Sequence, residues 1–237
     1  MPEHSLPSSL IPANDSDRLQ ELHRYQVLAA TNERILDELA ALTARLFQTP
    51  ISLISLVDKD DVVFRGNFGL PGAERVARNL SLCSVGILQD ATVVFENLKD
   101  EPCELTDPTV ARQLDLQFYA GHPLRSPNGY NIGTLCVIDR QPRSFSPAEE
   151  TLLQTLAGVV IRLLELRLAL SAHSESSFVL WDPVYKAIEG QLSRLQKLAD
   201  EAAASPSAAG LTPAMTREAA AIARIIDQLI AATLVRI

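Results

Sequence analysis

Hydrophobic residues recur at two different periods along the first two thirds of the chain. Every third or fourth residue is apolar over 19–25 and again over 35–46, which predicts two amphipathic helices, the first beginning at Ser16. Residues 51–57 are apolar at most positions, a pattern typical of a central strand. Further strands are expected over 62–64, 92–95, 117–124 and 132–139. The last two are joined through Asn128 and Gly129, a strong hairpin turn.

This order of elements predicts an α+β fold with a five- to six-stranded antiparallel sheet flanked by helices. A long helix should follow the sheet from Pro147. Its start combines a Ser146 cap, a proline at the first helical position and Glu149 placed to complete a capping box. A seam of apolar residues continues along this helix until a serine-rich stretch at 171–177 interrupts it.

Two further helices are predicted after this stretch, each with an apolar seam at alternating three- and four-residue spacing. Thr212 and Pro213 mark the start of the second. We expect an antiparallel hairpin, and because one hairpin alone leaves its seams in water, a homodimeric four-helix bundle. Folding of the hairpin onto the preceding domain of the same chain is the alternative. The seam residues expected at the dimer interface are Phe178, Trp181, Tyr185, Ile188, Leu192, Leu195, Ile222, Ile226 and Leu229.

The chain is therefore divided into a loose tail at 1–14, an α+β domain at 15–170 and a helical hairpin at 171–237. Of its 237 residues, 47% are hydrophobic, which is enough for a proper core, and the net charge is −8. This acidic balance argues against nucleic acid and anionic lipid as partners. No stretch is apolar enough to span a membrane, so a cytoplasmic location is expected. The three cysteines match neither a zinc site nor a disulfide framework, and we expect no cofactor or metal.

Five segments in collinear order resemble a GAF domain of the type found in bacterial histidine kinases and diguanylate cyclases. They are DRLQELHRYQVL, TPISLISLVDKDDVVFRGNFGLP, NLSLCSVGILQ, QFYAGHPLRSPNGYNIGTLCVID and SFSPAEE. The resemblance covers about residues 17–170. It implies a twisted antiparallel sheet with helices on one side and, on the other, a pocket that binds small ligands in many members.

The same resemblance implies four pocket candidates: Cys83, Phe118, Tyr119 and His122. Cys83 stands where this subgroup commonly carries a cysteine near a helix start, a setting that can activate a thiol. An inert, buried thiol is the alternative. His122 could contact a ligand or could be a hydrogen-bonded residue at a strand end. Cys136, inside an apolar strand, is expected in the core.

The C-terminal hairpin resembles the dimerisation and phosphotransfer hairpin of histidine kinases. Phe178 occupies the position of the phosphorylated histidine and Val179 that of its acidic neighbour, while Pro183, Ile188 and Gly190 match the family pattern. No nucleophile or base remains at that position, and no glycine-rich phosphate loop is present, so kinase activity is not expected.

These features together predict a non-enzymatic sensor or adaptor. The GAF-type pocket would sense a small molecule or partner, and the hairpin would contact a histidine kinase or response regulator. One alternative is a thiol-based redox sensor, or an enzyme like the methionine-sulfoxide reductases, using Cys83 with Cys103 as resolving partner. Another is a phosphotransfer protein using His173, which lies ten residues before Pro183.

Overall fold

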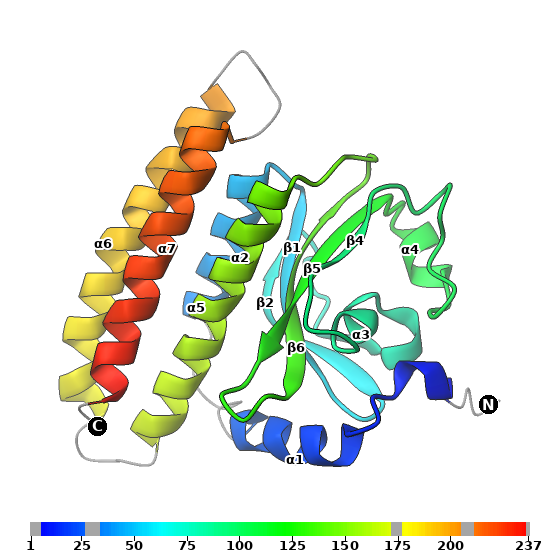
Figure 1. Cartoon of the computed structure of the whole chain (residues 1–237), viewed down its shortest axis with the longest axis horizontal. Coiled ribbons are helices and arrows are strands. Elements are labelled where there is room, and N and C mark those ends of the chain that lie inside the picture. Colours follow the sequence, from blue (N-terminus) through cyan, green and yellow to red (C-terminus); the bar gives the residue numbers. More distant parts are fainter. Residues whose placement is uncertain (1–5, 27–33, 172–176, 205–210, 236–237) are drawn as a thin grey trace.

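A six-stranded antiparallel sheet forms the centre of the molecule (Figure 1). The computed structural model describes residues 6–26, 34–171, 177–204 and 211–235, with the backbone alone for 177–183. The strands are β1 (Ile51–Val57), β2 (Asp61–Phe68), β3 (Arg75–Ala77), β4 (Val93–Phe95), β5 (Phe118–Arg125) and β6 (Asn131–Asp139). Their order across the sheet is β3-β2-β1-β6-β5-β4, so β1 is central, as its apolar sequence predicts. The expected α+β fold is confirmed.

Helices cover both faces of the sheet. On one face lie α2 (Arg34–Phe47) and α5 (Pro147–Ser171), while α1 (Asp15–Gln26) contacts β6 and α5. The short helices α3 (Cys83–Gly86) and α4 (Thr109–Gln113) lie on the opposite face (Figure 1). Single 3₁₀ turns occur at Ser8–Leu10 and Arg78–Leu80.

The predicted local signals at the start of α5 and in the β5–β6 turn are confirmed. Ser146 Oγ accepts a hydrogen bond from the Glu149 backbone N–H at 3.3 Å, and Glu149 Oε2 accepts one from the Ser146 N–H at 2.8 Å. This reciprocal pair satisfies two N–H groups that a helix start leaves without partners. Gly129 has a φ of +87° in the turn between β5 and β6, where a side chain would be strained.

The last two helices form the expected antiparallel pair and dock on the same chain. They are α6 (Ser177–Ala204) and α7 (Pro213–Leu234), and Thr212 Oγ1 caps α7 by accepting from the Met215 N–H at 3.3 Å. Helix α6 packs against α2, and α7 packs along α5. Thus α2 and α5 take the place that we expected the hairpin of a second copy to take.

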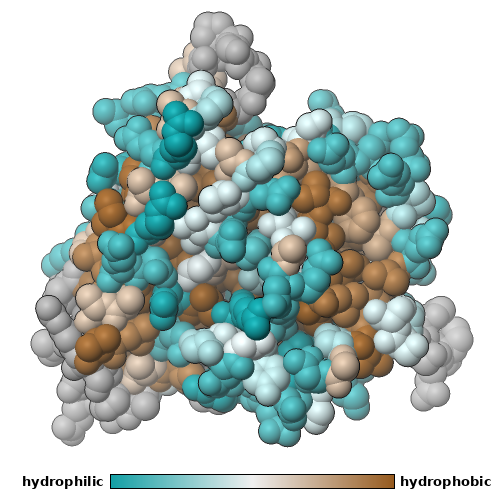
Figure 2. Space-filling model, viewed as in Figure 1, coloured by the Kyte–Doolittle hydropathy of each residue, from teal (hydrophilic) through white to brown (hydrophobic). Residues whose placement is uncertain are grey.

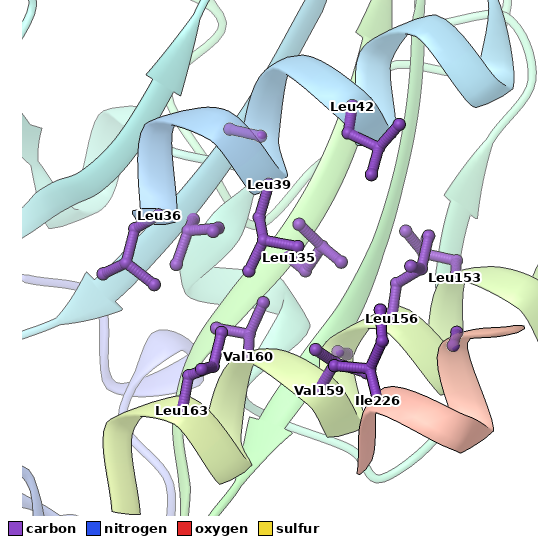
Figure 3. Packing of buried hydrophobic residues seen from close by; sticks show 14 of the residues in the cluster. Leu36, Leu39, Leu42, Leu135, Leu153, Leu156, Val159, Val160, Leu163 and Ile226 are labelled. Atoms are coloured by element: carbon purple, nitrogen blue, oxygen red, sulfur yellow. The ribbon is translucent and has the colours of Figure 1, made fainter. Parts of the chain in front are cut away.

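This docking buries much of the predicted dimer seam inside one chain. Ile226 lies among residues of α5, including Leu156 and Val159 (Figure 3). The buried seam residues are Ile188, Leu195, Ile222 and Ile226, and the half-buried ones are Tyr185, Leu192 and Leu229. The seam is not left in water, so the reason for expecting a dimer no longer holds. The dimer stays a prediction, but the four buried residues cannot form its interface while the hairpin is docked. The side chains of Phe178 and Trp181 lie outside the described residues, as does His173.

Candidate functional site

A cavity of about 180 Å³ lies on the face of the sheet that α3 and α4 cover. Its wall is mostly apolar, and Figure 2 shows hydrophobic residues gathered at the surface on this side of the molecule. Arg75 stands at the edge with 65% of its side chain exposed. The lining residues are Leu53, Phe64, Leu70, Ala73, Arg75, Val76, Leu80, Ser81, Leu82, Cys83, Val110, Ala111, Leu114, Leu116, Tyr119 and Ile138.

Tyr119 brings a buried polar group to this wall. Its side chain is fully buried, and its hydroxyl makes no hydrogen bond of normal geometry with the described residues, although the Cys83 thiol and the Thr134 hydroxyl lie nearby. Burial raises the pKa of the phenol well above its ordinary value, so the hydroxyl keeps its proton. An unpaired hydroxyl in an apolar setting costs free energy, which a ligand offering a partner can recover.

Two thiols lie side by side next to Tyr119. Cys83, the first residue of α3, places its Sγ 3.8 Å from the Sγ of Cys136 on β6. A hydrogen bond from the Cys136 thiol, aided by hydroxyls of Ser55, Thr134 and Ser81, lowers the pKa of Cys83 to about 6 against the opposing effect of burial. The same bond and burial raise the pKa of Cys136. The pair is therefore set to lose its first proton from Cys83.

Paired strands supply the hydroxyls beneath these thiols. Ser55 on β1 is opposite Thr134 on β6, and their hydroxyl oxygens are 2.8 Å apart. Cys136 is opposite Leu53 in the same pairing. Sequence reasoning placed Cys136 in the core but did not connect it with Cys83. The alternation of side chains along β6 puts Thr134 and Cys136 on one face, but register and the position of α3 were needed to complete the cluster.

Phe118 and His122 do not line this cavity, in contrast to the prediction. Successive residues of a strand point to opposite faces, so residues 118 and 119 cannot both face the cavity. Phe118 packs instead on the helix-covered side, with its ring 5.7 Å from that of Phe145 and 5.4 Å from the Arg143 guanidinium. His122 Nδ1 is 2.9 Å from Thr92 Oγ1, and burial lowers the pKa of this histidine. His122 is thus a hydrogen-bonded residue, the second of the two possibilities.

Cys103 is not brought to Cys83 either. It lines a neighbouring cavity of about 270 Å³, which shares Leu82, Ala111 and Leu116 with the first cavity but does not include Cys83. In the described part of the chain, the sulfur that Cys83 contacts is that of Cys136. The proposed pairing of Cys83 with Cys103 therefore has no support from the geometry.

The residues that the structure describes contain no group of three or more histidine, cysteine, aspartate or glutamate side chains arranged to hold a metal ion. Within the same ranges, none of the helices combines the length and the apolar character that crossing a bilayer requires.

Comparison with known proteins gives a family match and more distant relatives. The GAF domain family model matches residues 31–162, more than half of the chain. A cyclic di-GMP phosphodiesterase of Pseudomonas aeruginosa is 33% identical over 132 residues, covering 56% of this chain and 22% of that protein. The chain thus spans about a fifth of the length of this curated relative.

Solved structures of the same fold share less sequence. The GAF domain of an Acinetobacter phosphoenolpyruvate-protein phosphotransferase is 21% identical, with a TM-score of 0.47 over 62% of this chain and 92% of that chain. A free methionine-R-sulfoxide reductase of Neisseria meningitidis is also 21% identical, with a TM-score of 0.46 over 61% of this chain and 83% of that chain.

The expectation that the chain is not an enzyme is contradicted, because the curated relative that is 33% identical over 132 residues is named as a cyclic di-GMP phosphodiesterase. The missing phosphoacceptor and phosphate loop argued against kinase chemistry alone and left other reactions open. The fold, the cavity on the face opposite α2 and α5, and the match over 31–162 agree, and the chain belongs to the GAF domain family, a sensor fold of signalling proteins.

Proposed function

We propose that this GAF domain senses a small, largely apolar molecule that carries one hydrogen-bonding group and binds in the cavity beside Tyr119. The observation that carries this proposal is the buried hydroxyl of Tyr119, which makes no hydrogen bond of normal geometry with the described residues and belongs to a mostly apolar wall. Such a wall favours an apolar ligand, and the hydroxyl favours one with a single acceptor or donor.

The size of the cavity limits the ligand. A protein cavity of about 150 Å³ lined by apolar residues can hold benzene, and this cavity measures about 180 Å³. A single ring with a small substituent therefore fits, while a dinucleotide is far too large for it.

The strand that carries Tyr119 also contacts the helices on the other face. Next to Tyr119, Phe118 and Ala120 belong to the core that includes Leu153 and Leu156 of α5. Helix α5 in turn packs along α7. Strand β5 thus separates the cavity from α5, and a shift of Tyr119 on ligand binding would press on the helix that holds the hairpin.

Phenol and toluene test the cavity because they have nearly the same shape but carry a hydroxyl and a methyl group, respectively. Calorimetric titration of the full chain should show phenol binding about fivefold more tightly than toluene, since one additional hydrogen bond contributes about 1 kcal/mol. Tyr119→Phe should abolish this preference without weakening toluene binding. Tyr130→Phe, which removes a half-buried hydroxyl near the β5–β6 turn, is the matched control and should keep the preference. Failure of both probes to bind contradicts the proposal.

A second proposal concerns the pathway that the sensor serves. The curated relative is named as a cyclic di-GMP phosphodiesterase, and 33% identity over 132 residues supports a role for this chain in cyclic di-GMP signalling. Because the cavity is too small for that nucleotide, its occupant would be a regulator. Expressing the chain in a bacterium that makes cyclic di-GMP should change the nucleotide's concentration, and an unchanged concentration with folded chain present argues against this role.

For the hairpin, we propose a protein-contact role related to the phosphotransfer hairpin that its sequence resembles. The antiparallel pair α6 and α7 and the capped start of α7 support this relation. A second copy, a histidine kinase or a response regulator would bind the seam after its release from α2 and α5. Light scattering with and without phenol tests the homodimer: a doubled mass on binding supports it, and a monomer in both conditions contradicts it.

A further inference from the structure

We propose that Cys83 and Cys136 are an oxidation site, at which a peroxide entering the cavity converts the two thiols into a reversible disulfide. This inference concerns the thiols themselves and does not depend on which ligand the cavity binds. It also differs from the pairing of Cys83 with Cys103 considered from the sequence, because the observed sulfur contact is with Cys136.

The two sulfurs are in nonbonded contact, with no other atom needed between them. Their separation is 3.8 Å, and a disulfide bond is about 2.0 Å long, so a closure of less than 2 Å completes the bond. Cys136 lies in the central part of β6, which pairs on both sides with β1 and β5. Cys83 belongs to the four-residue helix α3 outside the sheet, so we expect α3 to make most of the movement.

The cavity offers a route to the first thiol. Cys83 forms part of its wall, and the exposed side chain of Arg75 marks the edge where the cavity meets solvent. A volume of about 180 Å³ accommodates hydrogen peroxide easily. Cys136 is absent from the cavity wall, so Cys83 is the thiol that peroxide meets first. The lowered pKa of Cys83 agrees with this order, because the thiolate is the reactive form.

The reaction takes two balanced steps. The Cys83 thiolate attacks one oxygen of the peroxide, the O–O bond breaks, and hydroxide leaves and becomes water with the proton that Cys83 lost. Cys83 is then a sulfenic acid. The Cys136 sulfur attacks Cys83 Sγ, the S–S bond forms, the S–O bond breaks, and the departing hydroxide takes the Cys136 proton as a second water. Two thiols are oxidised by two electrons and one peroxide is reduced to two waters.

Closing this bond would alter the cavity itself. It would draw α3, which contributes Cys83 to the wall, toward β6. It would also remove the thiol hydrogens beside Tyr119 and Thr134, which interact with the pair. An oxidised chain should therefore bind a cavity probe with a different affinity from the reduced chain.

Peptide mapping of the intact, folded chain after treatment with hydrogen peroxide tests the proposal. Of the three free cysteines, only Cys103 should remain as a thiol, a Cys83–Cys136 linked peptide should appear, and dithiothreitol should reverse the change. Cys103→Ser should leave the reaction unaltered. A link between Cys83 and Cys103, or survival of the Cys83 thiol while the chain stays folded, would overturn the assignment.

The order of the steps has its own test. Cys136→Ala, checked for native circular dichroism, should stop at the sulfenic acid of Cys83, which a dimedone label traps. If that variant does not fold, a time course on the original chain with the same label should detect the sulfenic acid at Cys83 before the disulfide. Labelling that begins at Cys136 contradicts the proposed order.

Discussion

Asp15 holds two buried arginine side chains where the N-terminal segment meets the sheet. Its carboxylate accepts hydrogen bonds from Arg18 Nε at 2.7 Å and from Arg78 Nη1 at 3.1 Å. Arg18 also donates to the Val57 carbonyl oxygen at 2.6 Å, and Arg78 donates to that of Leu10 at 2.9 Å. Both arginine side chains are 1% exposed, so loss of the Asp15 charge would leave buried positive charge without its counter-ion. Through these two arginines, the Asp15 carboxylate connects α1 with β1 and with the 3₁₀ turns at Ser8–Leu10 and Arg78–Leu80.

Asp15→Asn should therefore lower the free energy of unfolding by about 3 kcal/mol near neutral pH. Burial alone would raise the pKa of Asp15, but hydrogen bonds from Arg78 and Arg18 lower it below 3.8. The folded chain consequently releases this proton more readily than the unfolded chain does. The stabilisation is complete above pH 3.8 and is lost as the pH falls through the lower, folded value.

Urea unfolding between pH 2.5 and 7 measures this effect. The original chain should lose more stability on acidification than Asp15→Asn does. Asp17→Asn changes an exposed carboxylate two residues away and should behave like the original chain. Equal acid sensitivity of the original chain and Asp15→Asn would show that the carboxylate does not have this role.

At the scale of elements, the docking of α6 and α7 depends on a few buried residues. Ile226 is fully buried among α5 residues (Figure 3), whereas its neighbour Ile225 is 37% exposed. Two hydrogen bonds join the hairpin to the domain at its edges. Arg162 Nε donates to Asp227 Oδ1 at 3.1 Å, and Arg45 Nη1 donates to Gln196 Oε1 at 2.7 Å. Exposed links of this kind contribute little, so apolar burial holds the hairpin.

Ile226→Asp should release the hairpin while the sheet stays folded, because it buries an unpaired carboxylate at the contact with α5. Hydrogen exchange should then accelerate in α6 and α7 and stay slow in β1 and β6. Ile225→Asp places the same charge on the exposed side of α7 and should leave exchange nearly unchanged. Simultaneous loss of protection in β1 and β6 would show instead that hairpin and sheet unfold as one unit.

Elements defined by local chemistry were predictable from the sequence. The run from Ile51 to Val57, the Ser146 cap and the turn at Gly129 each follow from neighbouring residues. The contact between Cys83 and Cys136 was not, because it depends on how α3 sits over the sheet, and 53 residues separate the two thiols. The partner of the α6 and α7 seams was not predictable either. An apolar seam indicates that the helix face is buried, but it does not identify the covering surface, which can be α2 and α5 of the same chain or a second copy.

Taken as a whole, the molecule places α3 and α4 on one side of the sheet and the hairpin on the other (Figure 1). Residues of α3 and α4 line the cavity, which therefore lies on the side away from the hairpin. Tyr119 faces the cavity, its neighbour Phe118 packs toward α5, and α5 holds α7. This layered arrangement gives a short physical route from ligand to hairpin, because a close-packed strand cannot shift on one face without disturbing the other. Proof of coupling requires that occupancy of the cavity change the stability of the docked hairpin.

Hydrogen exchange of α6 and α7, measured on the full chain with and without saturating phenol, tests this claim most directly. We predict that phenol changes the exchange rates in α6 and α7 as well as those in α3 and β5. The same treatment of Tyr119→Phe should give a smaller change at equal occupancy, since the ligand no longer engages the strand through the hydroxyl. Phenol binding that alters exchange around the cavity and leaves α6 and α7 unaffected would contradict the claim that ligand binding in the cavity is coupled to the docking of the hairpin.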